Sequence, residues 1–186
     1  MRSIVPLIGV ALAAPASAAA AEVVPVPRFQ SIQLYGGGEV QLRRGAVQRV
    51  TLLEGSRAFT NIRVLSEGKL RIDACNPRCP RHYRLRILVE SPTVPVLAVS
   101  GGGLIRAGTG FASPRALTVA VSGGGLIDTV AVPADVATAA VNGGGEIKVS
   151  ARRVLTAAVN GGGVVRYWGN PVVTQVVKGG GIVRRY

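Results

Sequence analysis

The heptapeptide Val121-Ser122-Gly123-Gly124-Gly125-Leu126-Ile127 recurs, with small changes, along the second half of the chain. Gly-Gly-Gly triplets begin at positions 36, 101, 123, 143, 161 and 179, and the last five are 22, 20, 18 and 18 residues apart. Two residues before these five triplets stand Val99, Val121, Val141, Val159 and Val177. Two residues after them stand Ile105, Ile127, Ile147, Val165 and Val183. The region 96–186 is therefore built from one repeated unit.

The columns beside each triplet alternate apolar and polar residues, as β-strands do. A unit of about 20 residues cannot bury its own apolar face, but stacked copies turn each column into a continuous inner wall. The near-identical orientation of the copies favours parallel strands, with equivalent residues about 4.8 Å apart. The sequence thus predicts an all-β parallel β-solenoid with repeats of 18–22 residues. The alternation leaves the opposite parity open, in which Ala and Thr columns fill the core.

The glycine triplets are interpreted as structural turns, where a Cβ would clash or the backbone needs unusual dihedral angles. A dinucleotide-binding loop would need Gly-x-Gly-x-x-Gly, and no triplet is followed by glycine at the third position. No phosphate-binding P-loop occurs either, so no cofactor is predicted. The turn residues are Gly101, Gly102, Gly103, Gly123, Gly124, Gly125, Gly143, Gly144, Gly145, Gly161, Gly162, Gly163, Gly179, Gly180 and Gly181.

The N-terminus predicts a secretory signal peptide over residues 1–21. Arg2 supplies the positive start, Ile4 to Ala14 the apolar stretch, and residues 15–18 an Ala-x-Ala-type cleavage site. An uncleaved anchor is the alternative, although a spanning helix needs about 20 apolar residues. After a short linker (22–27), a single domain is expected over 28–186, irregular over 28–95 and regular over 96–186. The protein is predicted to be exported to the periplasm or cell surface, without a later transmembrane segment.

Two cysteines, Cys75 and Cys79, lie four residues apart in a Pro-containing segment. In an oxidising compartment, such a pair predicts a disulfide bond that closes a tight turn. The alternative is a metal site that adds His82. That set has three ligands, and the chain holds no further Cys or His to complete a tetrahedral site. The disulfide is preferred, and no metal is predicted.

The charges argue against common hydrolytic chemistry. The chain has 22 basic and 9 acidic residues, and 19 of the basic residues are Arg. No two acidic residues share an aligned repeat column, whereas glycoside hydrolysis usually needs a pair of carboxylates. His82 is the only candidate base for a nucleophilic triad, and no Gly-x-Ser-x-Gly occurs. A non-enzyme is expected, with a polysaccharide-active enzyme as the most distant alternative.

One column predicts a basic ladder on the outside of the stacked repeats. It holds Arg106, Lys148, Arg166 and Arg184, interrupted by Asp128. Loss of Arg2 with the signal peptide leaves a formal charge of +12, so this ladder is a candidate site for an anionic glycan or lipopolysaccharide. The alternative is that these residues only keep exposed strands soluble. The scattered aromatic residues provide no stacking platform for specific nucleic-acid binding.

A second column pair predicts a flat face of small residues. Its members are Thr118, Thr138, Thr156 and Thr174, with Ala98, Ala120, Ala140 and Ala158 two residues further along each copy. Such a face suits packing against another envelope protein or weak homo-oligomerisation. A structural or self-associating envelope component is therefore the alternative function.

The ordered set of motifs resembles a known family. The core (Ser/Asn)-Gly-Gly-Gly-x-(Ile/Val) is similar to the repeat of the head GIN domain of auto-transporter adhesins, a domain of unknown function. Phe29-x-x-Ile32, Gly68-x-Leu70-x-Ile72 and the turn at 169–171 follow in the same order, so that the likeness covers roughly residues 28–186. The resemblance implies a right-handed parallel β-helix, exported by bacteria, with an adhesin-like role and no established enzymatic activity.

Overall fold

The structure is a computed structural model that describes residues 21–76 and 78–186. The predicted signal peptide therefore lies outside the described residues, except for Ala21. The strands are β1 (Glu22–Val24), β2 (Ser31–Gly36), β3 (Glu39–Arg44), β4 (Arg49–Glu54), β5 (Asn61–Leu65), β6 (Lys69–Asp73), β7 (Arg86–Ser91), β8 (Val96–Gly101), β9 (Leu104–Ala107), β10 (Ala116–Ser122), β11 (Leu126–Asn142), β12 (Glu146–Asn160), β13 (Val164–Trp168), β14 (Val172–Lys178) and β15 (Ile182–Arg185). A single 3-10 turn, η1 (Ser66–Gly68), joins β5 to β6.

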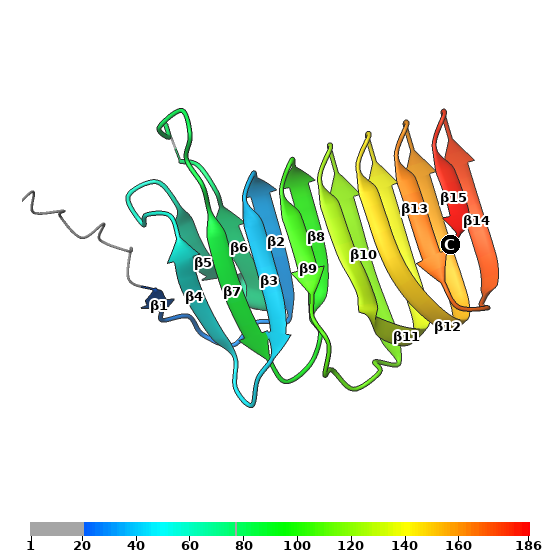
Figure 1. Cartoon of the computed structure of the whole chain (residues 1–186), viewed down its shortest axis with the longest axis horizontal. Coiled ribbons are helices and arrows are strands. Elements are labelled where there is room, and N and C mark those ends of the chain that lie inside the picture. The colour runs from blue at the N-terminus through cyan, green and yellow to red at the C-terminus, as the bar shows by residue number, and fades with distance from the viewer. Residues whose placement is uncertain (1–20, 77) are drawn as a thin grey trace, which may run out of the picture.

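The strands form two facing layers of one continuous sheet (Figure 1). Strands β4, β7, β3, β9, β13 and β15 lie in the first layer, and β5, β6, β2, β8, β10 and β14 lie in the second. The long strands β11 and β12 belong to both, because they bend. In β11, residues 126–128 pair with β9, whereas residues 136–142 pair with β10. The bends of β11 and β12 connect the two layers at one edge of the molecule. The glycine triplets connect them at the opposite edge.

The predicted right-handed parallel β-helix is wrong. The 15-stranded sheet is mixed and folds over on itself, so that it is nearly closed and barrel-like. Three pairs are antiparallel, namely β1 with β4, β4 with β7, and β5 with β6. The other strand pairs are parallel, and they include all the pairs between strands of the glycine repeats.

The antiparallel end arises where the chain has no glycine triplet. The turn η1 is only three residues long, and such a short connection between paired strands gives an antiparallel hairpin. Within it, Glu67 adopts a φ of 66°. The side chain of Lys69 donates a hydrogen bond to Glu67, and the two opposite charges attract each other. Both effects lower the pKa of Glu67 and raise the pKa of Lys69. Residues 22–24, assigned to a linker by sequence, form β1 and cover the edge of β4.

The core lies between the two layers. Val99, Val121, Val141 and Val159 are each 2% exposed. On the facing layer, Ile105, Ile127, Ile147 and Val165 are fully buried. The Thr and Ala columns of the repeats point outward, so the opposite parity left open by the sequence is excluded. In the last copy the same column is less protected, since Val177 is 40% exposed.

The glycine turns stack directly on one another. Gly143 has a φ of +117°, and a Cβ there would lie 2.8 Å from the carbonyl oxygen of Gly123 in the preceding turn. At Gly145 a Cβ would lie 2.6 Å from the carbonyl oxygen of Gly125. The middle glycine differs, because a Cβ at Gly144 would meet nothing within 4 Å. The first and third glycines are therefore required by close backbone approach, and the second is not.

We predict that Gly143→Ala lowers the free energy of unfolding by at least about 2 kcal/mol, because it combines a backbone clash with a disfavoured φ. The matched variant Gly144→Ala should stay within about 0.5 kcal/mol of the unmodified protein. Urea unfolding followed by circular dichroism measures both. An equal loss of unfolding free energy in the two variants would show that close backbone approach is not the reason for glycine at these positions.

Candidate functional site

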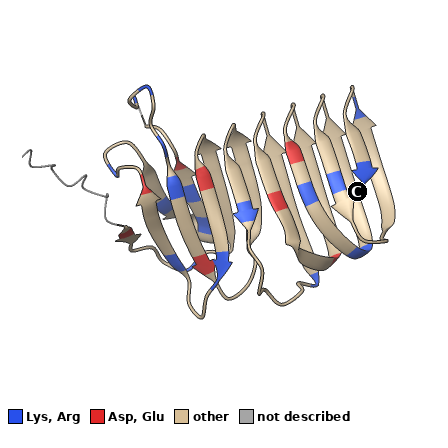
Figure 2. Ribbon diagram, viewed as in Figure 1, with Lys and Arg blue, Asp and Glu red and all other residues tan. Residues whose placement is uncertain are grey.

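The basic ladder is aligned by the strand register. Direct cross-strand pairs join Arg106 to Asp128, Asp128 to Lys148, Lys148 to Arg166, and Arg166 to Arg184. These residues come from β9, β11, β12, β13 and β15 and form one outward row on the first layer (Figure 2). Arg106 and Arg184 are exposed, while Lys148 and Arg166 are half-buried.

Two carboxylates partly neutralise this row. Asp128 stands between Arg106 and Lys148, as the sequence indicated. Glu146 lies in the adjacent column, and its Oε1 is 3.1 Å from Nε of Arg166. Comparison within one column of the repeats does not reveal this partner, because Glu146 lies on the neighbouring strand, in register with Val164 rather than with Arg166. The ladder therefore presents four cations against two carboxylates. Among the described residues, Arg106, Lys148 and Arg184 form no ion pair.

Charges near the N-terminal end of the sheet are also paired. On the first layer, Arg86 is 3.7 Å from Glu39, and Arg49 is 3.7 Å from Glu90. On the second layer, Asp73 contacts Nε of Arg71 at 2.9 Å. Most of this surface is thus of mixed sign rather than a continuation of the ladder.

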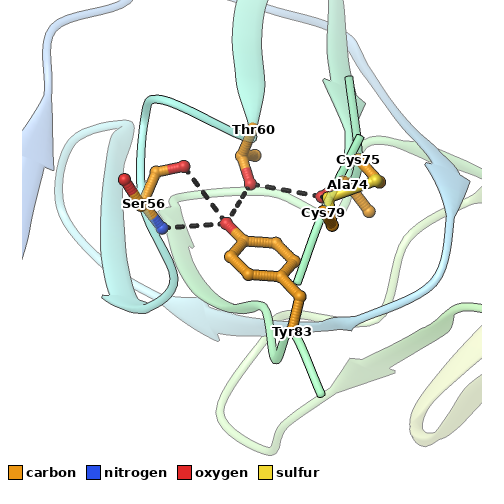
Figure 3. The surroundings of a disulfide bond; sticks show 6 residues. All are labelled: Ser56, Thr60, Ala74, Cys75, Cys79 and Tyr83. Carbon is orange, nitrogen blue, oxygen red and sulfur yellow. Dashed lines mark hydrogen bonds between the residues drawn. A yellow bond between two sulfur atoms is a disulfide. The ribbon is translucent and has the colours of Figure 1, made fainter. Parts of the chain in front are cut away.

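A disulfide bond joins Cys75 and Cys79, whose Cα atoms are 5.7 Å apart (Figure 3). Because both sulfurs are bonded to each other, neither is available as a thiolate ligand for the metal site considered with His82. His82 is exposed beside the bridge. Among the described residues, no group of three or more His, Cys, Asp or Glu could hold a metal ion.

Tyr83 fastens the segment that follows the disulfide. Its hydroxyl oxygen accepts the backbone N–H of Ser56 at 2.8 Å and lies 2.6 Å from the hydroxyl of Thr60 (Figure 3). The Thr60 hydroxyl in turn donates to the carbonyl of Ala74, next to Cys75, at 3.3 Å. The ring packs edge-on against Phe59 with 5.6 Å between centroids. No repeat or motif marks Tyr83 in the sequence.

The flat face lies on the outside of the second layer. Register pairs align Thr118, Thr138, Thr156 and Thr174 in one row and Ala98, Ala120, Ala140 and Ala158 in the next. The Ala row and the neighbouring Ser and Asn side chains line a shallow groove of about 640 Å³. Tyr35 stands at one end of this groove, and Val176 and Lys178 stand at the other.

The last repeat exposes apolar side chains. Val172 is 72% exposed, Val176 56% and Ile182 49%, because the described strands β14 and β15 each pair with one other strand only. Tyr186 packs against Trp168 with 5.0 Å between ring centroids. The last strands therefore leave a group of large apolar side chains on the surface.

The part of the chain that the structure describes contains no helix long and apolar enough to cross a membrane.

Residues 111–171 match the model of a family described as "Putative auto-transporter adhesin, head GIN domain". The match includes the triplets that begin at 123, 143 and 161 and covers less than half of the chain. It confirms the resemblance predicted from the glycine repeats. No curated protein matches the sequence.

Several solved structures are similar in shape. A putative adhesin from Bacteroides fragilis has a TM-score of 0.55 at 17% identity, over 89% of this chain and 96% of that chain. A putative adhesin from Parabacteroides distasonis has a TM-score of 0.47 at 18% identity, over 90% and 96%. A putative cell adhesion protein from Clostridium sporogenes has a TM-score of 0.39 at 9% identity, over 89% and 97%. The first shows a shared fold and nothing more, and the other two add no further argument.

We predict that Tyr83→Phe lowers the free energy of unfolding by about 1–2 kcal/mol, because the N–H of Ser56 and the hydroxyl of Thr60 lose their partner. Tyr35→Phe is the matched control, since its hydroxyl makes one long contact, 3.4 Å to Gln33. Urea unfolding compares the two. A loss at Tyr35→Phe as large as that at Tyr83→Phe would contradict the anchoring role.

Proposed function

We propose that the protein is a non-enzymatic, adhesin-like binding module exported to the bacterial periplasm or cell surface. Three observations support this: the family match over residues 111–171, the fold shared with a putative adhesin, and a sequence that begins with a predicted signal peptide. The excess of cations makes an anionic envelope polymer the best-suited partner.

The basic ladder is the proposed contact surface. The observation that carries this assignment is the strict register, which sets neighbouring side chains of the row about 4.8 Å apart. Arg106 and Arg184 are four strands apart, so the row extends about 19 Å. An anionic glycan, such as the saccharide part of lipopolysaccharide, carries its charges along an extended chain and fits a row better than a pocket. Glu146 holds the guanidinium of Arg166 and leaves Arg106, Lys148 and Arg184 to the ligand.

We predict that heparin, used as an anionic glycan probe, binds the signal-free protein and is released by salt. The ladder variant Arg106→Gln/Lys148→Gln/Arg184→Gln should bind at least about five-fold more weakly, because three cationic contacts are lost. It keeps the Glu146–Arg166 pair intact. Fluorescence titration across a salt series measures the affinity.

The matched control is the loop variant Arg78→Gln/Arg81→Gln/Arg84→Gln, which removes the same charge from exposed positions away from the ladder. It should bind heparin within about two-fold of the unmodified protein. Equal weakening in the ladder and loop variants would mean that net charge, rather than the aligned row, binds the glycan.

Self-association through the flat face is the second candidate function. The groove over the Ala row favours it, because aligned small side chains allow two sheets to pack closely. The groove ends at Val176, which is 56% exposed and would be covered in such a contact. A partner copy or another envelope protein with a flat apolar face would fit.

If this face self-associates, the mean mass in sedimentation-velocity experiments should rise with concentration. Ala140→Lys/Ala158→Lys should hold the protein monomeric, because it places two charges in the groove. Thr109→Lys/Ser113→Lys adds the same charge in an exposed loop and should not change association. A mass that stays monomeric at every concentration excludes this candidate.

A further inference from the structure

The loop between β6 and β7 carries three arginines and one histidine, separate from the ladder. Arg78, Arg81, His82 and Arg84 are all exposed within it. Within the described ranges, no ion pair involves Arg78, Arg81 or Arg84. Strand arginines such as Arg49, Arg86 and Arg166, in contrast, each face a carboxylate. We call Arg78, Arg81 and Arg84 the arginine loop.

The arginine loop is braced at both ends. At its start, the Cys75–Cys79 bridge closes the chain on itself. In its middle, the N–H of Tyr83 donates to the carbonyl of Pro80 at 3.0 Å, and the Tyr83 hydroxyl is fastened to Ser56 and Thr60. At its end, Leu85 is 3% exposed and accepts the N–H of Glu39 at 2.8 Å. A braced loop loses less conformational entropy when its side chains bind a ligand.

The loop projects at the edge of the molecule. Figure 1 shows it rising beyond the neighbouring turn between β2 and β3, on the side where all the glycine turns lie. The middle glycines at this edge, such as Gly124 and Gly144, have no side chain that could hinder the approach of a ligand to the loop. Figure 2 shows that Lys and Arg colour this loop while no Asp or Glu does. A broad, flat surface can therefore meet the three arginines without obstruction from the body of the protein.

The chemistry of the loop suits phosphate. A guanidinium group presents donors in a planar fork that pairs two at a time with phosphate oxygens, and it stays charged at any physiological pH. The three arginines lie within seven residues of one loop, whereas the cations of the ladder come from separate strands. A plane of headgroups presents many phosphates to such a loop, whereas a single extended polymer chain fits the ladder better.

We propose that the arginine loop binds the phosphate groups of anionic lipid headgroups at a membrane surface. This site is separate from the glycan-binding row and does not depend on it. Each arginine near an anionic lipid surface contributes about five-fold to affinity. The three together are therefore worth roughly 100-fold.

Co-sedimentation with vesicles tests the proposal, using the signal-free protein. Vesicles of phosphatidylcholine with phosphatidylglycerol should bind the protein, and vesicles of phosphatidylcholine alone should not. The loop variant Arg78→Gln/Arg81→Gln/Arg84→Gln should bind the anionic vesicles roughly 100-fold more weakly. The ladder variant Arg106→Gln/Lys148→Gln/Arg184→Gln has lost the same charge and should bind them within about two-fold of the unmodified protein.

Three results would overturn the proposal: equal weakening in the two variants, unchanged binding by the loop variant, or no binding of the unmodified protein to anionic vesicles. A titration with inorganic phosphate separates the two sources of the ligand. If the loop binds free phosphate but not vesicles, the assignment to a membrane surface is wrong. The circular dichroism spectrum of the loop variant shows whether it is folded, independently of any ligand. Heparin binding by the same variant keeps failure here distinct from failure of the glycan proposal.

The variant Cys75→Ser/Cys79→Ser tests the brace with all charges retained. Its affinity for anionic vesicles should fall by at least about three-fold, because binding must then also order the loop, at a cost in conformational entropy. Its urea unfolding midpoint reports any wider loss of structure. Unchanged affinity in this variant would show that charge alone, without the braced geometry, accounts for binding.

Discussion

The close approach of glycine backbones at the turns is the constraint on which the rest of the structure depends. A Cβ at Gly143 would strike the carbonyl of Gly123, and the N–H of Gly143 donates to the carbonyl of Asn160 in the next coil at 2.8 Å. Each repeat must therefore turn at the same height as its neighbours. Once the turns are aligned, a residue at a fixed distance from the triplet has no freedom of register. Core valines, outward threonines and ladder cations are all placed by this one contact.

Much of the repeat region could be predicted because its information is periodic. The columns that contain Val121 and Ile127 are buried as the alternation indicated, and the Cys75–Cys79 bridge forms. The antiparallel end could not be predicted in the same way, because residues 45–72 contain no triplet to align. There, η1 returns the chain within one layer, and β1 pairs with a strand 26 to 30 residues away (Val24 with Val50 and Glu22 with Leu52). Such a partner is chosen by tertiary packing rather than by any local pattern.

The candidate site shows the same division. The alignment of Arg106, Lys148 and Arg184 follows from their equal distance from the triplets, so the sequence alone indicates the row. The contact between Glu146 and Arg166 depends on side-chain reach across two columns, which a column comparison does not contain. The contacts of Tyr83 are harder still to predict, because its partners Ser56 and Thr60 lie 27 and 23 residues away in a region without repeats.

The stacked glycines also limit where the protein can place its chemistry. At the turns, close backbone approach excludes side chains from the first and third positions of each triplet, and the middle position is also glycine. The triplets themselves therefore offer backbone but no functional groups. Binding groups must then stand on the strand faces, where register spreads them into rows, or on a segment inserted between strands, where they can cluster. The ladder is of the first kind, and carboxylates on neighbouring strands inevitably approach it. The arginine loop is of the second kind, and within the described residues its three arginines form no ion pair. An insertion in a repeat of this type is therefore the place where a compact anion-binding site can arise without disturbing the register that holds the sheet together.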